Sequence, residues 1–433
     1  MKDTKSSPLK IKGWGWIPSL YFAEGLPYVL VMTVSVIMYK KLGISNTDIS
    51  LFTSLLYLPW VIKPLWSPVV DIFRTKRSWI TTMQLFLALG LLGIALSLTL
   101  NDFFTVSFIV FAVMAFFSAT HDIAADGFYM IALPQKEQSY FVGIRSLFYR
   151  ISMIAGQGLL VIAAGFFETR FRAETGGNKY AWMLTFLIPA AIFILFYLYH
   201  NFVLPRPAED KSVSKREGKN FSSEFVNAFK EFFKKKQIGV VISFLLLYRL
   251  GESQLVKLAS PFLLDAKETG GLGLLTQDVG FIYGTVGIVA LVIGGLAGGF
   301  AISRNGLKYW LWWMLIAINL PDVVYVYMSA VQPQSVFAVT LCVAIEQLGY
   351  GFGFTAYLMY MIYVSEGEYK TSHYAICTGF MALGMMLPGM ISGAIQEMLG
   401  YKMFFVWVCI STIPPFILAR YLRIDPEFGK KKI

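Results

Sequence analysis

Charged residues are scarce in this sequence. Asp, Glu, Lys and Arg together make up 15% of the 433 residues, whereas 56% are hydrophobic. Soluble globular domains carry about a quarter charged residues, so this composition excludes an ordinary water-soluble domain. The mean hydropathy of +0.61 instead indicates a chain that is surrounded by lipid.

Cysteine is also rare, and recognisable catalytic constellations are lacking. Cys342, Cys377 and Cys409 fall within apolar stretches and show neither metal-ligand spacing nor a paired framework, so we interpret them as packing residues. The sequence shows no nucleophile with an adjacent base and no cluster of metal ligands. We therefore assign no catalytic residue, expect no metal and no cofactor, and do not expect an enzyme.

Long apolar runs recur along the whole chain. Each is long enough to cross about 30 Å of hydrocarbon as a helix, and their continuous pattern favours helices over a barrel. We predict twelve spans, at residues 14–39, 47–70, 78–99, 103–132, 138–167, 180–202, 238–264, 275–302, 307–329, 334–364, 371–398 and 401–423. The first run is too long for a cleaved signal, so we interpret it as the first span.

The net charge of +11 is distributed over the connections between these runs. Twenty-five of the 37 Lys and Arg residues lie in the terminal segments and the alternate loops on the same side, and seven lie on the opposite side. The positive-inside rule then predicts cytoplasmic termini in a bacterial inner membrane. No basic domain face remains for nucleic acid. The expected partners are membrane lipids, protons and a small-molecule substrate, and we expect the protein to be a monomer.

The longest polar connection divides the spans into six plus six. Residues 203–237 begin as a flexible linker and continue with Phe221, Phe225, Phe229, Phe232 and Phe233 on one helical face beside several lysines. This pattern predicts an amphipathic helix on the inner leaflet; a disordered basic linker is the alternative. We expect an all-α membrane protein with an N-terminal six-helix bundle (1–202), a cytoplasmic linker (203–237) and a C-terminal six-helix bundle (238–433).

Several motifs resemble the major facilitator superfamily. The turn at 67–77 keeps the acidic and basic residues of its signature, Asp71, Arg74, Lys76 and Arg77, although Ser67 and Pro68 replace the glycine. The segments EGLP (24–27), LPWVIKPLWSPVVD (58–71), ATHDIAADG (119–127), YRISMIAGQG (149–158) and residues 372–401 resemble the branch of muropeptide permeases and acetyl-coenzyme A transporters. The resemblance implies two pseudo-symmetric bundles, alternating access and uptake driven by protons.

Two departures from that branch leave the substrate open. His121 stands where these permeases usually have Gln, and Phe128 and Tyr129 stand where muropeptide permeases carry a basic residue.

Ionisable residues within the spans are functional candidates, because such a group costs a few kcal/mol in hydrocarbon unless it faces a cavity or a partner. For proton coupling we predict Glu24, His121, Asp122, Asp126 and Glu346. For substrate binding we predict Tyr21, Glu24, Tyr28, Lys63, His121, Tyr149, Arg150, Tyr248, Arg249, Glu252, Glu346 and Tyr357. For gating we predict Asp71, Arg74, Arg77, Asp126, Arg145 and Arg304.

Asp122 and Asp126 are four residues apart and therefore share one helical face. The next span returns antiparallel, which predicts that Asp126 pairs with Arg145 and Asp122 with Arg150; such pairs either serve transport or only lock helices together. For His121, a structural hydrogen bond to a neighbour is an alternative to a proton relay.

These features predict a secondary transporter that takes up a cell-wall-derived, muropeptide-like or other anionic amphiphilic saccharide by proton symport. Cationic side chains in the spans favour an anionic substrate, and aromatic side chains suit a sugar. The alternatives are a carrier for a nucleotide thioester, a drug or another metabolite, and a membrane-embedded transferase.

Overall fold

The computed structural model describes residues 13–210, 221–367 and 369–430, and these residues form helices joined by short connections. The first half contains α1 (Ile17–Val29), α2 (Ser35–Lys41), α3 (Asn46–Leu55), α4 (Leu58–Phe73), α5 (Lys76–Ser97), α6 (Phe103–Ala132), α7 (Gln135–Met153), α8 (Val161–Arg170) and α9 (Gly177–Val203). The second half contains α10 (Phe221–Phe233), α11 (Ile238–Leu247), α12 (Leu250–Leu264), α13 (Thr276–Phe281), α14 (Ile288–Asn305), α15 (Leu307–Asn319), α16 (Val323–Val331), α17 (Val336–Ser365), α18 (Lys370–Ser411) and α19 (Ile413–Ala419).

Several spans combine two of these helices through a short irregular segment. The π-helical turns η1 (Leu30–Val34), η2 (Ile154–Leu160) and η5 (Ile282–Gly287) join α1 to α2, α7 to α8 and α13 to α14. The first of these spans also contains Pro27, which lacks the amide hydrogen that a regular helix uses.

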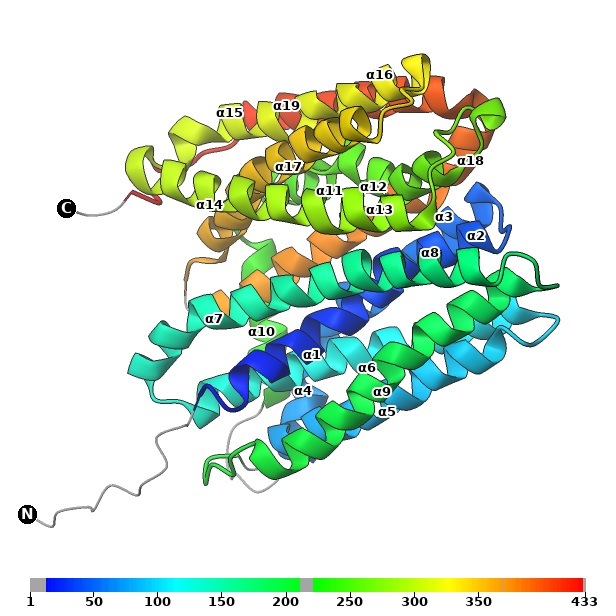
Figure 1. The fold of residues 1–433 in the computed structure, drawn as a ribbon. Helices are drawn as coiled ribbons and strands as arrows, with labels where there is room; N and C mark the ends of the chain where they lie inside the picture. The colour runs from blue at the N-terminus through cyan, green and yellow to red at the C-terminus, as the bar shows by residue number, and fades with distance from the viewer. Residues whose placement is uncertain (1–12, 211–220, 368, 431–433) are drawn as a thin grey trace, which may run out of the picture.

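The apolar helical stretches reproduce the predicted spans. Eleven stretches in the described residues are long and apolar enough to cross a membrane, and the last runs over 50 residues from Lys370 to Ala419. Fifty helical residues would measure about 75 Å, more than twice the thickness of the hydrocarbon layer. Gly400, with a φ of 72°, breaks this stretch, and the chain turns back toward α19 (Figure 1). The stretch therefore holds two spans, which restores the predicted twelve and confirms the all-α membrane fold.

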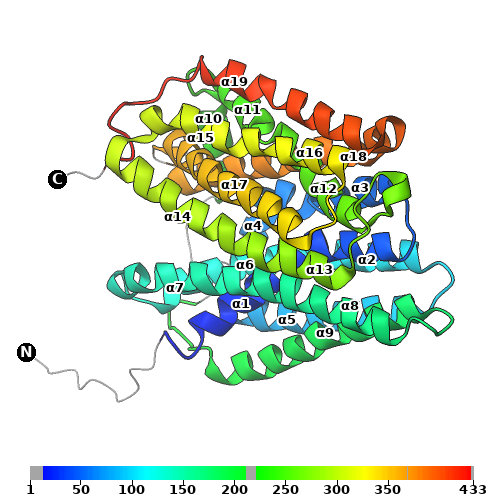
Figure 2. The same cartoon turned by 45° about the horizontal axis from the view of Figure 1, so that its top comes forward.

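The helices gather into two groups that face each other (Figures 1 and 2). In the first group α5 packs between α6 and α9, and α1 packs on α7; in the second, α17 packs between α14 and α15, and α12 packs on α18. The groups meet where α3 and α4 contact α18 and where α8 contacts α13. We call them the N-terminal and C-terminal bundles. We propose limits at residues 202 and 238 because α9 ends at Val203 and α11 begins at Ile238.

The residues predicted to form an amphipathic helix are helical as α10 (Phe221–Phe233). It packs on α18: the Phe232 side chain is buried and its ring centroid lies 5.5 Å from that of His373. The carbonyl of Ala228 lies 3.1 Å from His373 Nε2, and Lys235 Nζ donates to the carbonyl oxygens of Val364 and Glu366. The Phe221 and Phe225 side chains lie outside the described residues. Contact with the inner leaflet stays a prediction.

The orientation of the fold is testable because the start of α1 and the end of α19 lie at the same end of the molecule (Figure 1). With cytoplasmic termini, a green fluorescent protein fused to the C-terminus should fluoresce in the bacterial cell. Alkaline phosphatase inserted after Gly176 should be active, because it would then fold in the oxidising periplasm. If phosphatase is inactive after Gly176 and a second phosphatase fusion at the C-terminus is active, the topology is the reverse of the predicted one.

Candidate functional site

A cavity of about 680 Å³ lies between the two bundles, which is a usual size for a small-molecule site. The predicted residues among its lining are Glu24, Tyr28, Lys63, Asp122, Asp126, Arg145, Tyr149 and Arg249. The C-terminal bundle contributes Arg249 and one face of α18, including Tyr374 and Met385. The ionisable groups of the cavity therefore face a chamber and one another rather than hydrocarbon.

An acidic pair lies in the wall formed by the N-terminal bundle. Asp122 of α6 makes an ion pair with Lys63 of α4. Glu24 of α1 lies near Asp122 in the same wall, and both residues line the cavity. The neighbouring Gly25 permits this arrangement, because a Cβ atom there would lie 2.2 Å from Ser152 Oγ of α7. Three helices thus bring two carboxylates and one ammonium group together.

The second aspartate of α6 is held by α7 and α1. Arg145 donates from Nη2 to Asp126 Oδ1 at 2.7 Å, and the Tyr21 hydroxyl donates to the same oxygen at 3.2 Å. The guanidinium group also lies over the Tyr21 ring, 4.6 Å from its centroid. The predicted Asp126–Arg145 pair is confirmed. Tyr21 contacts both members of this pair but does not line the cavity.

The predicted pair between Asp122 and Arg150 is wrong, because Lys63 is the partner of Asp122. Five residues of an α-helix correspond to a rotation of about 140° beyond a full turn. Arg150 therefore points away from the direction of Arg145, and it does not line the cavity.

His121 lies behind the acidic pair in a buried hydrogen-bonded chain. Gln84 Nε2 lies 3.0 Å from His121 Nε2, Gln84 Oε1 lies 3.0 Å from His200 Nδ1, and the Ser19 hydroxyl lies 2.9 Å from His200 Nε2. An amide donates through its nitrogen and accepts through its oxygen, so Gln84 donates to His121 Nε2 and accepts from His200 Nδ1 when both imidazoles are neutral. His121 Nδ1 is buried without a hydrogen-bond partner among the described residues, and the role of His121, structural or in a proton relay, stays a prediction. Gln84 and His200 were missed because nothing local in the sequence marks them.

A break in one span positions Arg249. The residue separates α11 from α12 and has the non-helical angles φ −110° and ψ 27°. Its Nη2 donates to the Tyr350 hydroxyl at 2.5 Å, and the guanidinium lies over the rings of Tyr350 and Phe354. Its Nε is buried without a hydrogen-bond partner among the described residues.

Other predicted substrate ligands lie outside the cavity lining. Tyr248 and Tyr357 stack on each other with centroids 4.6 Å apart, and their hydroxyls donate to the carbonyl oxygens of Gly353 and Leu245. These positions do not support substrate contact. Glu252 and Glu346 are buried inside the C-terminal bundle rather than in the cavity.

The predicted gating residues other than Asp126 and Arg145 have diverse surroundings. Arg77 donates to the carbonyl oxygens of Leu204 and Asn201, so it ties the start of α5 to the end of α9 within one bundle. Arg74 and Arg304 are exposed. The Asp71 side chain lies outside the described residues, and the gating roles of all these residues stay predictions.

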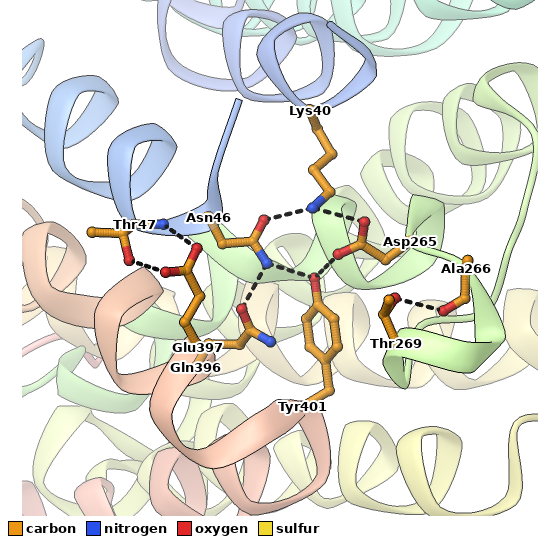
Figure 3. A network of polar contacts seen from close by, with 9 residues as sticks. All are labelled: Lys40, Asn46, Thr47, Asp265, Ala266, Thr269, Gln396, Glu397 and Tyr401. Atoms are coloured by element: carbon orange, nitrogen blue, oxygen red, sulfur yellow. Dashed lines mark hydrogen bonds and ion pairs between the residues drawn. The ribbon is translucent and has the colours of Figure 1, made fainter. Parts of the chain in front are cut away.

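A polar network that sequence analysis missed joins the bundles at the end opposite the termini (Figure 3). Lys40 Nζ lies 2.7 Å from Asp265 Oδ1, and Asp265 Oδ2 accepts a hydrogen bond from Tyr401. Asn46 donates to Gln396 Oε1 at 2.6 Å and to the Tyr401 hydroxyl. We call these residues, with the Thr47–Glu397 contact beside them, the latch.

Glycines let the backbones of the two bundles meet, at the latch and at a second place. A Cβ atom at Gly393 of α18 would lie 2.0 Å from the carbonyl oxygen of Asn46, and one at Gly284 would lie 2.0 Å from that of Gln157. Both contacts join the two bundles. The cavity is therefore sealed at this end, whereas its lining reaches Lys76, Met130 and Thr371 toward the end that holds the termini.

Comparison with known proteins gives the family. The sequence model of the Major Facilitator Superfamily matches residues 19–387. This chain belongs to the major facilitator superfamily. The predicted resemblance is confirmed, and so is the assignment as a transporter rather than an enzyme, which removes the alternative of a transferase.

The chain is also similar to individual transporters and to solved structures. It is 26% identical to the "Putative transporter AmpG 4" of Rickettsia conorii over 417 residues, 93% of this chain and 95% of the relative. It is 25% identical to the "Anhydromuropeptide permease" of Escherichia coli K12 over 429 residues, 95% of this chain and 80% of the relative. Among solved structures, the nucleoside transporter NupG matches 96% of this chain and 100% of that chain with a TM-score of 0.69 at 16% identity. A D-xylose-proton symporter matches 98% of this chain and 100% of that chain with a TM-score of 0.71 at 9% identity.

The close contact at Gly393 predicts that a larger side chain at this position opens the sealed end of the cavity. Gly393→Ala places a methyl group against the Asn46 carbonyl, and overpacking of this kind costs about 1–3 kcal/mol, so the closed state should lose roughly tenfold or more in population. Ser54, which is fully buried on α3, is a suitable reporter. In a cysteine-free background, Ser54→Cys should react roughly tenfold faster with a membrane-impermeant maleimide when Gly393→Ala is present.

The matched control is Gly299→Ala, because nothing lies within 4 Å of a Cβ atom at Gly299. Equal labelling rates in the Gly393 and Gly299 variants would show that the α3–α18 contact does not seal this end.

Proposed function

We propose that this transporter takes up an anionic amphiphilic saccharide of the muropeptide type together with protons, by alternating access of one cavity between its two bundles. The observation that carries the proposal is the acidic pair Glu24 and Asp122, which faces Lys63 at the wall of that cavity.

The acidic pair supports proton coupling through charge balance. One ammonium group, Lys63, balances one of the two carboxylates, and the other is stable in a poorly solvated wall as the protonated acid. A substrate carboxylate that binds Lys63 would replace Asp122 as the partner of the ammonium group. Asp122 would then be an unpaired buried charge, which costs free energy. Protonation of Asp122 removes this cost. Binding of the anion and of the proton therefore favour each other, and linkage makes this effect reciprocal.

Arg249 supports an anionic substrate from the opposite wall. Its guanidinium contacts aromatic residues and a hydroxyl, and no carboxylate forms an ion pair with it among the described residues. Guanidinium groups bind carboxylates through paired hydrogen bonds, and the buried Nε is available for one of them. A carboxylate held between Lys63 and Arg249 would contact both bundles, as alternating access requires.

Aromatic side chains support a sugar in the same chamber. Tyr28 and Trp60 pack edge to face at 5.2 Å, and Tyr57 and Tyr149 lie with them in the lining. Aromatic faces pack well against the apolar faces of sugar rings. The relative from Escherichia coli, an anhydromuropeptide permease, supports the same substrate class.

Uptake into proteoliposomes tests this assignment. Labelled anhydromuropeptide should accumulate when the inside is alkaline, and an excess of unlabelled compound should compete for uptake. A neutral saccharide without a carboxylate should compete poorly. Accumulation of a nucleotide thioester or another solute in place of the muropeptide would reassign the substrate, and the absence of a pH effect would remove proton coupling.

Asp122→Asn should abolish gradient-driven accumulation. A gradient of about one pH unit, used by a carrier of one proton per substrate, supports roughly tenfold accumulation, and this ratio should fall to about one in the variant. Exchange of labelled for unlabelled substrate should continue, because the neutral Asn side chain resembles the protonated Asp122 of the substrate-bound state. The matched control is Asp102→Asn, which changes the N-cap of the same helix outside the cavity. Accumulation at the wild-type ratio in Asp122→Asn would clear Asp122 of proton coupling.

A further inference from the structure

Three carboxylates converge inside the C-terminal bundle, outside the cavity lining. They belong to Glu252 of α12, Asp322 in the turn before α16, and Glu346 of α17. One oxygen atom from each lies within 4.8 Å of the others, and the three residues are at most 3% exposed. Glu252 lies in the first span of the second half, and Glu24 lies in the first span of the first half.

No ion pair among the described residues neutralises the charge of this cluster. No Lys or Arg makes an ion pair with any of the three carboxylates. Gln347 donates to both oxygens of Glu346, at 3.2 and 3.0 Å, but Glu252 Oε2 and both oxygens of Asp322 have no hydrogen-bond partner. Three ionised carboxylates at this distance repel one another strongly when they are shielded from water.

A fourth oxygen atom points to a ligand at the same place. Tyr325 lies one turn after Asp322, is fully buried, and has a hydroxyl group without a hydrogen-bond partner. Because Tyr325 follows Asp322 by three residues, the two side chains lie on the same side of this helical segment. Buried polar groups in proteins normally have hydrogen-bond partners. Glu252 Oε2, both Asp322 oxygens and the Tyr325 hydroxyl have none among the described residues, so the site is incomplete without a bound species.

We propose that Glu252, Asp322 and Glu346, with the Tyr325 hydroxyl, bind a hard metal cation, either Na⁺ or a divalent ion such as Ca²⁺. Every donor is oxygen, and hard cations prefer oxygen ligands, whereas softer metals prefer imidazole or thiolate. A positive ion satisfies the unpartnered oxygen atoms and balances the repulsion in one step. Protons shared among the carboxylates are the competing occupant, and the experiment separates the two.

The cluster is connected to the cavity through one helical turn on each of two helices. Glu252 lies three residues after Arg249, and Glu346 lies four residues before Tyr350, which accepts the hydrogen bond from Arg249. A cation at the cluster would reduce the negative field on Arg249 and leave that guanidinium better able to bind an anion. This link to transport rests on the proposed function, whereas the cation binding does not.

Direct binding to the purified full-length protein in nanodiscs tests the site without any transport substrate. At pH 8 in a choline background, equilibrium dialysis with ²²Na⁺ or ⁴⁵Ca²⁺ should give one saturable site per chain for one of the two ions. Asp322→Asn should weaken that binding at least tenfold, and Asp102→Asn should leave it unchanged. The absence of saturable binding of either ion to the wild type would overturn the proposal in favour of shared protons. Equal binding by wild type and Asp322→Asn would also overturn it, because the ion would then bind elsewhere.

Thermal unfolding gives a second measure that remains informative if one variant folds poorly. The wild type should unfold at a higher temperature as the bound ion is added, because the ligand stabilises the folded state. Glu346→Gln should unfold above the wild type in choline, since it removes one repelling charge, and should lose the response to the ion. An undiminished response in Glu346→Gln would contradict the site. A failed muropeptide assay with intact cation binding would remove the proposed substrate and leave this inference standing.

Discussion

The structure depends on how charge is tolerated within an apolar bundle. Each ionisable group within the spans must have a partner or a polar chamber, because hydrocarbon offers neither. In the N-terminal bundle the solution is pairing: Lys63 with Asp122, and Arg145 with Asp126. Both pairs lie in the wall of a cavity, so the groups that stabilise the helix contacts are also the groups that a solute meets. Stability and function therefore share the same atoms.

The two ends of the cavity differ in kind. The end away from the termini is held by the latch and by glycine contacts between backbones, which are short-range and depend on close fit. Such contacts are lost together when the surfaces separate, because a partly open interface has lost packing without gaining full hydration. A set of this kind gives two discrete arrangements rather than a continuum, as a rocking transporter requires.

The sequence predicted what is local. Apolar runs set the spans, and the Asp126–Arg145 pair followed from a short antiparallel connection. The partners of Asp122 and of Lys40 could not be predicted from the sequence. Lys63 lies 59 residues from Asp122, and Asp265 lies far from Lys40 along the chain. Tyr248 and Tyr357 were placed in the binding site because helices that are apolar on all sides do not reveal which face is turned to the cavity. The tyrosines instead pack in the core with their hydroxyls on backbone carbonyls.

The docking of α10 changes how the connection between the halves acts. Phe232, His373 and Lys235 fasten this helix to the C-terminal bundle, so the amphipathic segment travels with that bundle as one body. Asp210 accepts hydrogen bonds from the backbone amides of Lys76 and Arg77 and so belongs to the N-terminal bundle, and the chain passes from one bundle to the other between Asp210 and Phe221. A protein divided within that stretch would keep each half with its own complete set of packing partners, and the two fragments, made together in one cell, would be expected to reassemble.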